Sequence, residues 1–163
     1  MLFPLLASAA ILAGVGNSHF MGEAGPFAIV MADARKGDFG AEVGWDSAAK
    51  LETSDGWRVH GSADYWQGAI SVGLGYSHRH TSQWTKDRLW VRASVKQGII
   101  RLIAQAAPNS KNMEAMAELR VRMQHKRFVL EPRSWIGWHS TAEELGGYAY
   151  GLSILVGVGH PSQ

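Results

Sequence analysis

Apolar and polar side chains alternate along most of the chain with a period of two. The clearest case is residues 147–159, because one side of a strand made from them would carry only large apolar side chains. These are Tyr148, Tyr150, Leu152, Ile154, Val156 and Val158. The other side would carry mostly Gly, Ala and Ser, since successive side chains of a strand point to opposite faces. Such a segment is typical of a wall strand of a narrow barrel whose apolar face points outward.

The same alternation recurs in segments of about ten residues that are bounded by Gly, Pro, Asn, Asp or Ser. They predict strands near residues 10–19, 26–34, 38–47, 56–66, 68–78, 87–97, 99–107, 113–124, 127–139 and 147–159. Short and long connectors alternate between them, which is the pattern of an up-and-down meander. We therefore predict an all-β fold, an up-and-down antiparallel transmembrane β-barrel of about ten strands, with eight as the alternative number.

The 163 residues are the length of one domain, and we expect a single β-barrel domain over residues 10–160. Residues 1–14, MLFPLLASAAILAG, fit either a signal-like segment or the start of the first strand. Hydrophobic residues make up 46% of the chain. No apolar run approaches the roughly 20 residues of a membrane-spanning helix, which excludes a helical membrane protein.

The orientation of the two strand faces decides which kind of barrel this is. A soluble barrel has its apolar face inside, whereas a transmembrane barrel has it outside and in contact with the lipid bilayer. Aromatic residues at the strand ends favour the second, because they would form girdles at the two membrane interfaces. The predicted interfacial aromatics are Trp45, Trp57, Tyr65, Tyr76, Trp138 and Tyr148. We expect Val72, Leu74, Ile154 and Val156 to face lipid.

The polar faces carry charges of both signs, which could pair across a closed interior. The predicted polar network of the lumen comprises Glu42, Arg58, His60, Asp64, Arg92, Glu118, Arg120, Arg122, Glu131 and Arg133. These side chains would largely fill a narrow bore, so we expect no continuous ion channel. The formal net charge is only +2 and the basic residues are spread along the chain, so no nucleic-acid partner is expected. Cysteine is absent, which excludes disulfides and thiol chemistry, and we expect no cofactor.

The pattern resembles the small outer-membrane β-barrel proteins of Gram-negative bacteria from about residue 10 onward. The resemblance implies an outer-membrane location, a bilayer partner with lipopolysaccharide as a candidate contact, and a structural, adhesive or surface-modifying role of the loop rim. It leaves the oligomeric state open. In that family the last strand usually ends in an aromatic residue, whereas this chain ends in Val-Gly-His-Pro-Ser-Gln over residues 158–163.

One rim segment has the residue types of a serine hydrolase, namely His139, Ser140, Glu143 and Glu144. It resembles the rim site of outer-membrane lipid A deacylases, which carry His-x-Ser. His139 and Ser140 are adjacent, so their side chains would point apart unless the strand breaks at His139. A lipid acyl hydrolase is one alternative hypothesis, and a soluble barrel that binds an apolar ligand is another. The sequence favours a membrane barrel that is not an enzyme.

Two histidines, His78 and His80, could share one face of a strand as a pair of metal ligands. The sequence offers no third ligand nearby. We therefore predict no metal site.

Overall fold

The computed structural model describes residues 8–20, 23–47, 56–82, 85–107, 112–141 and 147–160, and the side chains of these residues except at 20, 23, 24, 112, 113 and 139–141. They form the strands β1 (Ser8–Phe20), β2 (Glu23–Lys36), β3 (Phe39–Asp46), β4 (Trp57–Gln67), β5 (Ile70–His80), β6 (Thr85–Gln97), β7 (Ile100–Ala107), β8 (Asn112–Val121), β9 (Met123–His125), β10 (Phe128–Thr141) and β11 (Gly147–His160). Over this part of the chain, no helix is long and apolar enough to cross a membrane.

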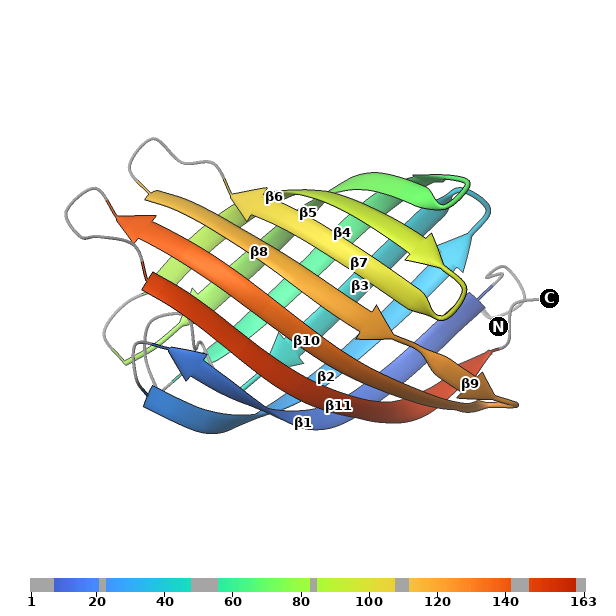
Figure 1. Ribbon diagram of the computed structural model, residues 1–163, viewed down its shortest axis with the longest axis horizontal. Coiled ribbons are helices and arrows are strands. Elements are labelled where there is room, and N and C mark those ends of the chain that lie inside the picture. Colours follow the sequence, from blue (N-terminus) through green and yellow to red (C-terminus); the bar gives the residue numbers. More distant parts are fainter. Residues whose placement is uncertain are drawn as a thin grey trace.

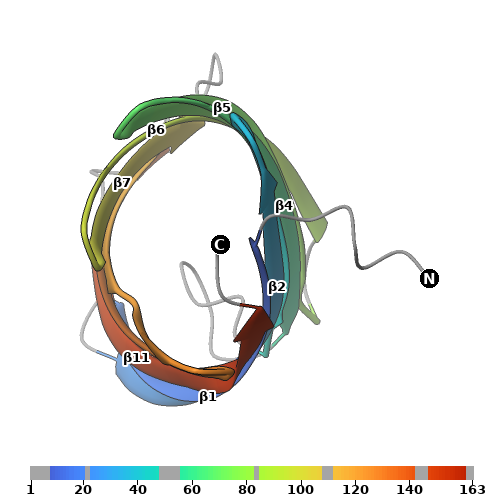
Figure 2. The same cartoon turned by 90° about the vertical axis from the view of Figure 1, so that its right-hand side faces the viewer.

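The strands form one antiparallel sheet that closes on itself (Figures 1 and 2), because β11 pairs with both β10 and β1. Strands β8 and β9 are two parts of one wall strand, since both pair with β10 in the same register. Their hydrogen-bond ladder with β10 is interrupted opposite Pro132, which has no N–H to donate. The wall therefore has ten strands, and the predicted up-and-down barrel is confirmed.

Four hairpins close in two-residue turns, at residues 37–38, 68–69, 98–99 and 126–127. The first residue of each turn has a positive φ, and in three of them this residue is glycine. The fourth is Lys126, at φ 53°. A residue with a Cβ adopts this left-handed conformation at a cost of roughly 1–2 kcal/mol.

The two ends of the described chain meet at the rim that carries these two-residue turns, because Ala9 pairs with His160.

The seam where the first and last strands meet has two very close backbone approaches. A Cβ added at Gly14 would lie 2.1 Å from the carbonyl oxygen of Ile154, and one added at Gly157 would lie 2.0 Å from that of Ile11. No side chain fits into either space. Glycine at these two positions therefore allows β1 and β11 to pair.

The outer surface of the barrel is apolar along the strands. Val72, Leu74, Ile154 and Val156 are 58%, 67%, 57% and 57% exposed, although they lie in the middle of paired strands. Their outward orientation is the one predicted for a transmembrane barrel. It is opposite to that of a soluble barrel with an apolar interior, so that alternative is wrong.

The inner surface is divided into two sectors. Strands β1, β2, β10 and β11 contribute an apolar inner wall, formed by Ala10, Leu12, Ile29, Met31, Val129 and Leu155 with Phe27 packed against them. The remaining strands carry most of the charged groups of the lumen. This wall also gives the inward face of residues 26–34, which the alternation alone leaves open.

Candidate functional site

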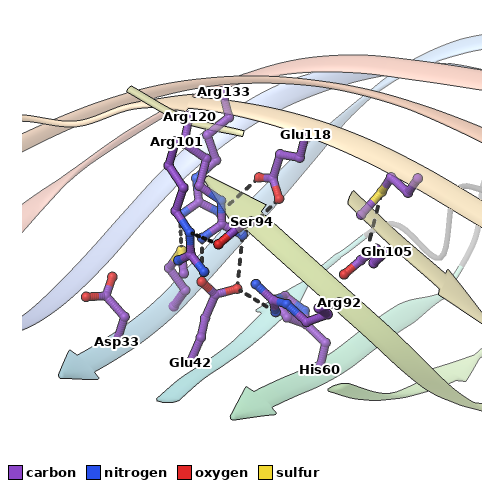
Figure 3. A network of polar contacts seen from close by, with 12 residues as sticks. Asp33, Glu42, His60, Arg92, Ser94, Arg101, Gln105, Glu118, Arg120 and Arg133 are labelled. Carbon is purple, nitrogen blue, oxygen red and sulfur yellow. Dashed lines mark hydrogen bonds and ion pairs between the residues drawn. The ribbon is translucent and has the colours of Figure 1, made fainter. Parts of the chain in front are cut away.

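A row of alternating carboxylates and arginines crosses the lumen, and each member lies within 4 Å of the next. Figure 3 shows its central part around Glu42 and Arg120. In order of contact, these are Asp33, Arg122, Glu131, Arg133, Glu118, Arg120, Glu42, Arg92, Asp64 and Arg101. We call this set the ion-pair chain. Its five negative and five positive charges balance, so its charges compensate one another within the lumen.

A buried contact in the middle of the ion-pair chain joins Arg120 on β8 to Glu42 on β3. Arg120 donates two hydrogen bonds to this carboxylate, one of them from Nη2 to Oε1 over 3.0 Å. The same Nη2 donates to Glu118 over 2.8 Å. Glu42 and Arg120 are each only 6% exposed. A buried arginine that lost its carboxylate here would remain as an uncompensated charge, which makes the contact costly to break.

Two cavities lie on either side of this contact, since Glu42 and Arg120 line both of them. One extends toward the loop ends of the strands and has a volume of about 90 Å³; we call it the loop-side chamber. The other extends toward the two-residue turns and has a volume of about 100 Å³; we call it the turn-side chamber. The ion-pair chain therefore separates two small spaces.

The loop-side chamber combines charged and aromatic side chains. Among the described residues that line it are five arginines, Arg58, Arg79, Arg92, Arg120 and Arg133, and three carboxylates, Glu42, Asp46 and Glu118. Arg58 contacts Asp46 with an N–O distance of 2.6 Å. Trp90 and Trp135 add aromatic wall, and the Trp135 ring lies where a Cβ of Gly151 would be, 2.6 Å from its Nε1.

Above this chamber, one buried carboxylate gathers three cations. Glu114 on β8 is only 1% exposed, and it lies 3.3 Å from Arg79, 2.9 Å from Lys86 and 3.1 Å from Arg88. These contacts join β5, β6 and β8 near their loop ends. They add positive charge to the loop half of the lumen.

The turn-side chamber contains an aromatic ring held between the wall and two cations. Trp66 is buried, and the guanidinium carbons of Arg35 and Arg101 lie 4.7 Å and 4.8 Å from its ring centroid. Both distances are within the range of cation–π contacts. Arg101 also contacts Asp64 at 3.1 Å, so this ring is linked to the ion-pair chain.

All ten residues of the predicted lumen network line one of the two chambers. The predicted network left out nine further charged residues of the lumen, namely Asp33, Arg35, Asp46, Arg79, Lys86, Arg88, Lys96, Arg101 and Glu114. Arg79 and Lys86 were hidden because the prediction placed residues 79–86 in a connector, whereas β5 runs to His80 and β6 begins at Thr85. Continuing the inward alternation from Ser77 by two residues would have found Arg79, and continuing it from Trp90 by two and four residues would have found Arg88 and Lys86.

The two histidines that were considered as metal ligands, His78 and His80, lie at the loop end of β5 and face outward. His78 Nδ1 lies 2.8 Å from Asp87 Oδ1, and His80 Nδ1 lies 3.1 Å from Thr85 Oγ1. The Trp57 ring lies against both imidazoles, at centroid distances of 5.5 and 5.4 Å. Within the described residues, no group of three His, Asp or Glu side chains could hold a metal ion.

Five of the six predicted interfacial aromatics lie near the ends of their strands, whereas Tyr76 lies further inside β5. Trp45 and Trp57 flank the connector between β3 and β4, while Tyr148 is near the start of β11 and Trp138 near the end of β10. Tyr65, near the turn end of β4, makes an edge-on ring contact with Phe39 at 5.4 Å. Trp45, Tyr65, Tyr76 and Tyr148 are exposed on the outer surface.

The backbone at the proposed hydrolase segment is regular. The ladder between β10 and β8 continues through His139 and Ser140 to Thr141, so the strand does not break at His139 as such a site requires. Glu143 and Glu144 lie outside the described residues. In the part of the chain that the structure describes, the backbone condition for this hypothesis is therefore not met.

The closed antiparallel wall, apolar outside and charged inside, defines a transmembrane β-barrel. Among solved structures, the chain is similar to the KdgM porin in complex with disordered oligogalacturonate, with 10% identity over 88% of this chain and 97% of that chain and a TM-score of 0.46. It is also similar to Neisserial surface protein A (NspA), with 15% identity over 93% of this chain and 95% of that chain and a TM-score of 0.42. A scan of protein-family models and a search of curated proteins found no match. The class therefore rests on the chain's own strand pairing and face orientation.

Proposed function

We propose that the protein is an outer-membrane β-barrel with a closed lumen, which acts through its loop rim in a structural, adhesive or surface-modifying role. The observation that carries this proposal is the ion-pair chain across the lumen. A barrel built for conduction would leave a continuous polar path between its rims, whereas here ten charged side chains contact one another across it.

The membrane location is supported by the outer surface. Closure of the sheet satisfies the backbone hydrogen bonds of the wall, which a bilayer demands. The outward side chains of β11 are apolar from Tyr148 to Val158, which is the length that a bilayer core requires, about 9–11 residues of a tilted strand. Transmembrane barrels with tight turns at one rim and longer connectors at the other are outer-membrane proteins. The outward Trp45, Tyr65 and Tyr148 support an aromatic boundary at each rim.

The closed lumen is supported by the energetics of the pairs. An ion that crossed the barrel would have to separate Arg120 from Glu42, and each uncompensated buried charge costs about 3–5 kcal/mol. The ion-pair chain is neutral as a whole, so it needs no mobile counterion. A resting barrel should therefore not pass ions steadily.

Conductance across planar bilayers tests this proposal. We expect no sustained current from the wild-type barrel. The double variant Glu42→Gln, Arg120→Met removes one pair without leaving either charge behind, and we expect it to conduct measurably more. Asp87→Asn, which changes a carboxylate on the outer surface, is the control and should remain silent. A steady wild-type current that the double variant leaves unchanged would contradict the closed lumen.

Fractionation of Gram-negative cells that express the protein tests the location separately. We expect the protein to sediment on a density gradient with lipopolysaccharide rather than with inner-membrane markers. Recovery in the soluble fraction without detergent would contradict the membrane location.

A further inference from the structure

We propose that the loop-side chamber binds a small organic anion, a carboxylate attached to a short apolar or aromatic body. This binding site goes beyond the closed-barrel function and does not depend on it. Three properties of the chamber carry the proposal: donors without partners, an excess of arginine, and an aromatic wall.

The first property is a set of buried donors in the chamber lining that lack hydrogen-bond partners. Within the described residues these include Ser18 Oγ, His60 Nδ1, and Nε and Nη2 of Arg92. Buried polar groups of proteins almost always have a partner, so these atoms have room for one, which can be water, an ion or a bound molecule. A hydroxyl, an imidazole and a guanidinium can all donate. The partner that would satisfy all of them is an acceptor.

Arg92 is the strongest of these groups. It is only 5% exposed, and its contacts to Asp64 at 3.5 Å and Glu42 at 3.8 Å are longer than good hydrogen bonds. The better contacts of these carboxylates go to other arginines, because Asp64 pairs with Arg101 at 3.1 Å and Glu42 pairs with Arg120. Arg92 therefore retains donors that can bind a further anion. A carboxylate fits a guanidinium with two parallel hydrogen bonds.

The second property is the charge of the lining. Its five arginines outnumber its three carboxylates, each of which already has an arginine partner. Arg79, Arg92 and Arg133 also contact carboxylates outside the lining, but one of these, Glu114, is shared with Lys86 and Arg88. His60 lines the same chamber as Arg92, and the carboxylate that it contacts, Asp46, is 3.9 Å away and is engaged with Arg58. A monoanion placed among these groups would reduce the excess positive charge.

The third property is the wall that completes the chamber. Phe27, Ile29, Trp90, Met116 and Trp135 supply apolar and aromatic surface beside the charged groups. Binding sites for small molecules typically combine such surface with a few convergent polar groups. Inorganic phosphate would use the arginines but not this wall. A volume of about 90 Å³ restricts the ligand to a small molecule with one carboxylate.

Titration of the purified barrel in detergent micelles with benzoate tests the proposal, using calorimetry and the tryptophan fluorescence reported by Trp90 and Trp135. We expect saturable binding with a Kd below about 1 mM, which corresponds to roughly −4 kcal/mol. Benzamide, which has the same ring without the charge, should bind at least tenfold more weakly. Inorganic phosphate should also bind at least tenfold more weakly.

The variant Arg92→Met removes the free donors, and we expect it to weaken benzoate binding at least tenfold. Arg35→Met is the matched control, because it makes the same substitution in the turn-side chamber, and its effect should stay below twofold. Arg92→Lys keeps the charge but loses the planar fork, so it should weaken binding as well and serves if Arg92→Met does not fold. Heat-modified migration on gels checks that each variant is a folded barrel.

Three results would overturn the proposal: no saturable benzoate binding, unchanged binding by both Arg92 variants, or phosphate binding as tight as benzoate. These results are separable from the closed-lumen proposal. A barrel that binds benzoate but conducts ions would refute only the closed lumen. A silent barrel that binds no benzoate would refute only the anion site.

Discussion

Replacing Glu42 by glutamine should destabilise the barrel far more than its similar size suggests. Glu42 accepts two hydrogen bonds from Arg120 and lies 3.8 Å from Arg92, and all three side chains are buried. Removing one partner of a buried ion pair typically costs about 3–5 kcal/mol, because the other charge remains uncompensated. Arg120 keeps Glu118 at 2.8 Å. We therefore expect a loss near the lower limit, about 3 kcal/mol.

The double variant Glu42→Gln, Arg120→Met should recover much of this loss. It leaves four carboxylates and four arginines in the ion-pair chain, so the balance of charge is restored. Replacement of a whole buried pair by neutral groups of similar size is often close to neutral in stability. We expect the double variant to lie within about 1–2 kcal/mol of the wild type, and the two single changes to be clearly non-additive.

Equilibrium unfolding in urea, followed by tryptophan fluorescence of the barrel in lipid vesicles, measures both quantities. Asp87→Asn is the control, because its carboxylate is 59% exposed and makes hydrogen bonds to Tyr76 and His78 on the outer surface. Contacts that are exposed to solvent contribute little to stability. If Glu42→Gln lowers the free energy of unfolding no more than Asp87→Asn does, then water screens the charges in the lumen. The description of Glu42 and Arg120 as a desolvated pair would then be wrong.

Two further predictions concern the wall and one turn. Leu74→Arg should cost roughly 2–4 kcal/mol in vesicle unfolding experiments if Leu74 lies near the bilayer midplane, whereas Leu74→Ala should cost much less, and equal losses would argue against contact with lipid. Lys126→Gly should stabilise the barrel by about 1 kcal/mol, because Lys126 has a left-handed backbone, whereas Lys126→Ala should give no such gain.

The architecture could be predicted from the sequence because a single period governs both the fold and the orientation. Ten alternating segments predict ten wall strands, and the outward position of Leu74 and Ile154 follows from the same alternation. The split between β8 and β9 was not predicted. The split arises because Pro132 on β10 has no N–H to donate. The interruption is assigned to the facing strand, which divides into β8 and β9, whereas β10 itself continues.

The partners within the lumen could not be predicted in the same way. Alternation identifies Glu42 and Arg120 as inward residues, but their contact joins positions 78 residues apart across a closed bore. That contact depends on the register of every intervening strand. Asp33 was missed for a different reason, since the surrounding residues 26–34 are apolar on both faces and give no sign of which side is inside.

The seam between β1 and β11 has a consequence for how the barrel assembles. It joins the two ends of the described chain, so it can form only after every other wall strand is in place. Until then the molecule is a curved sheet with two unpaired edges and an apolar outer surface. Water is a poor solvent for that surface, and lipid is a poor solvent for those edges. Insertion and closure must therefore proceed together, and the last step depends on two backbones approaching where Gly14 and Gly157 carry no methyl group to keep them apart.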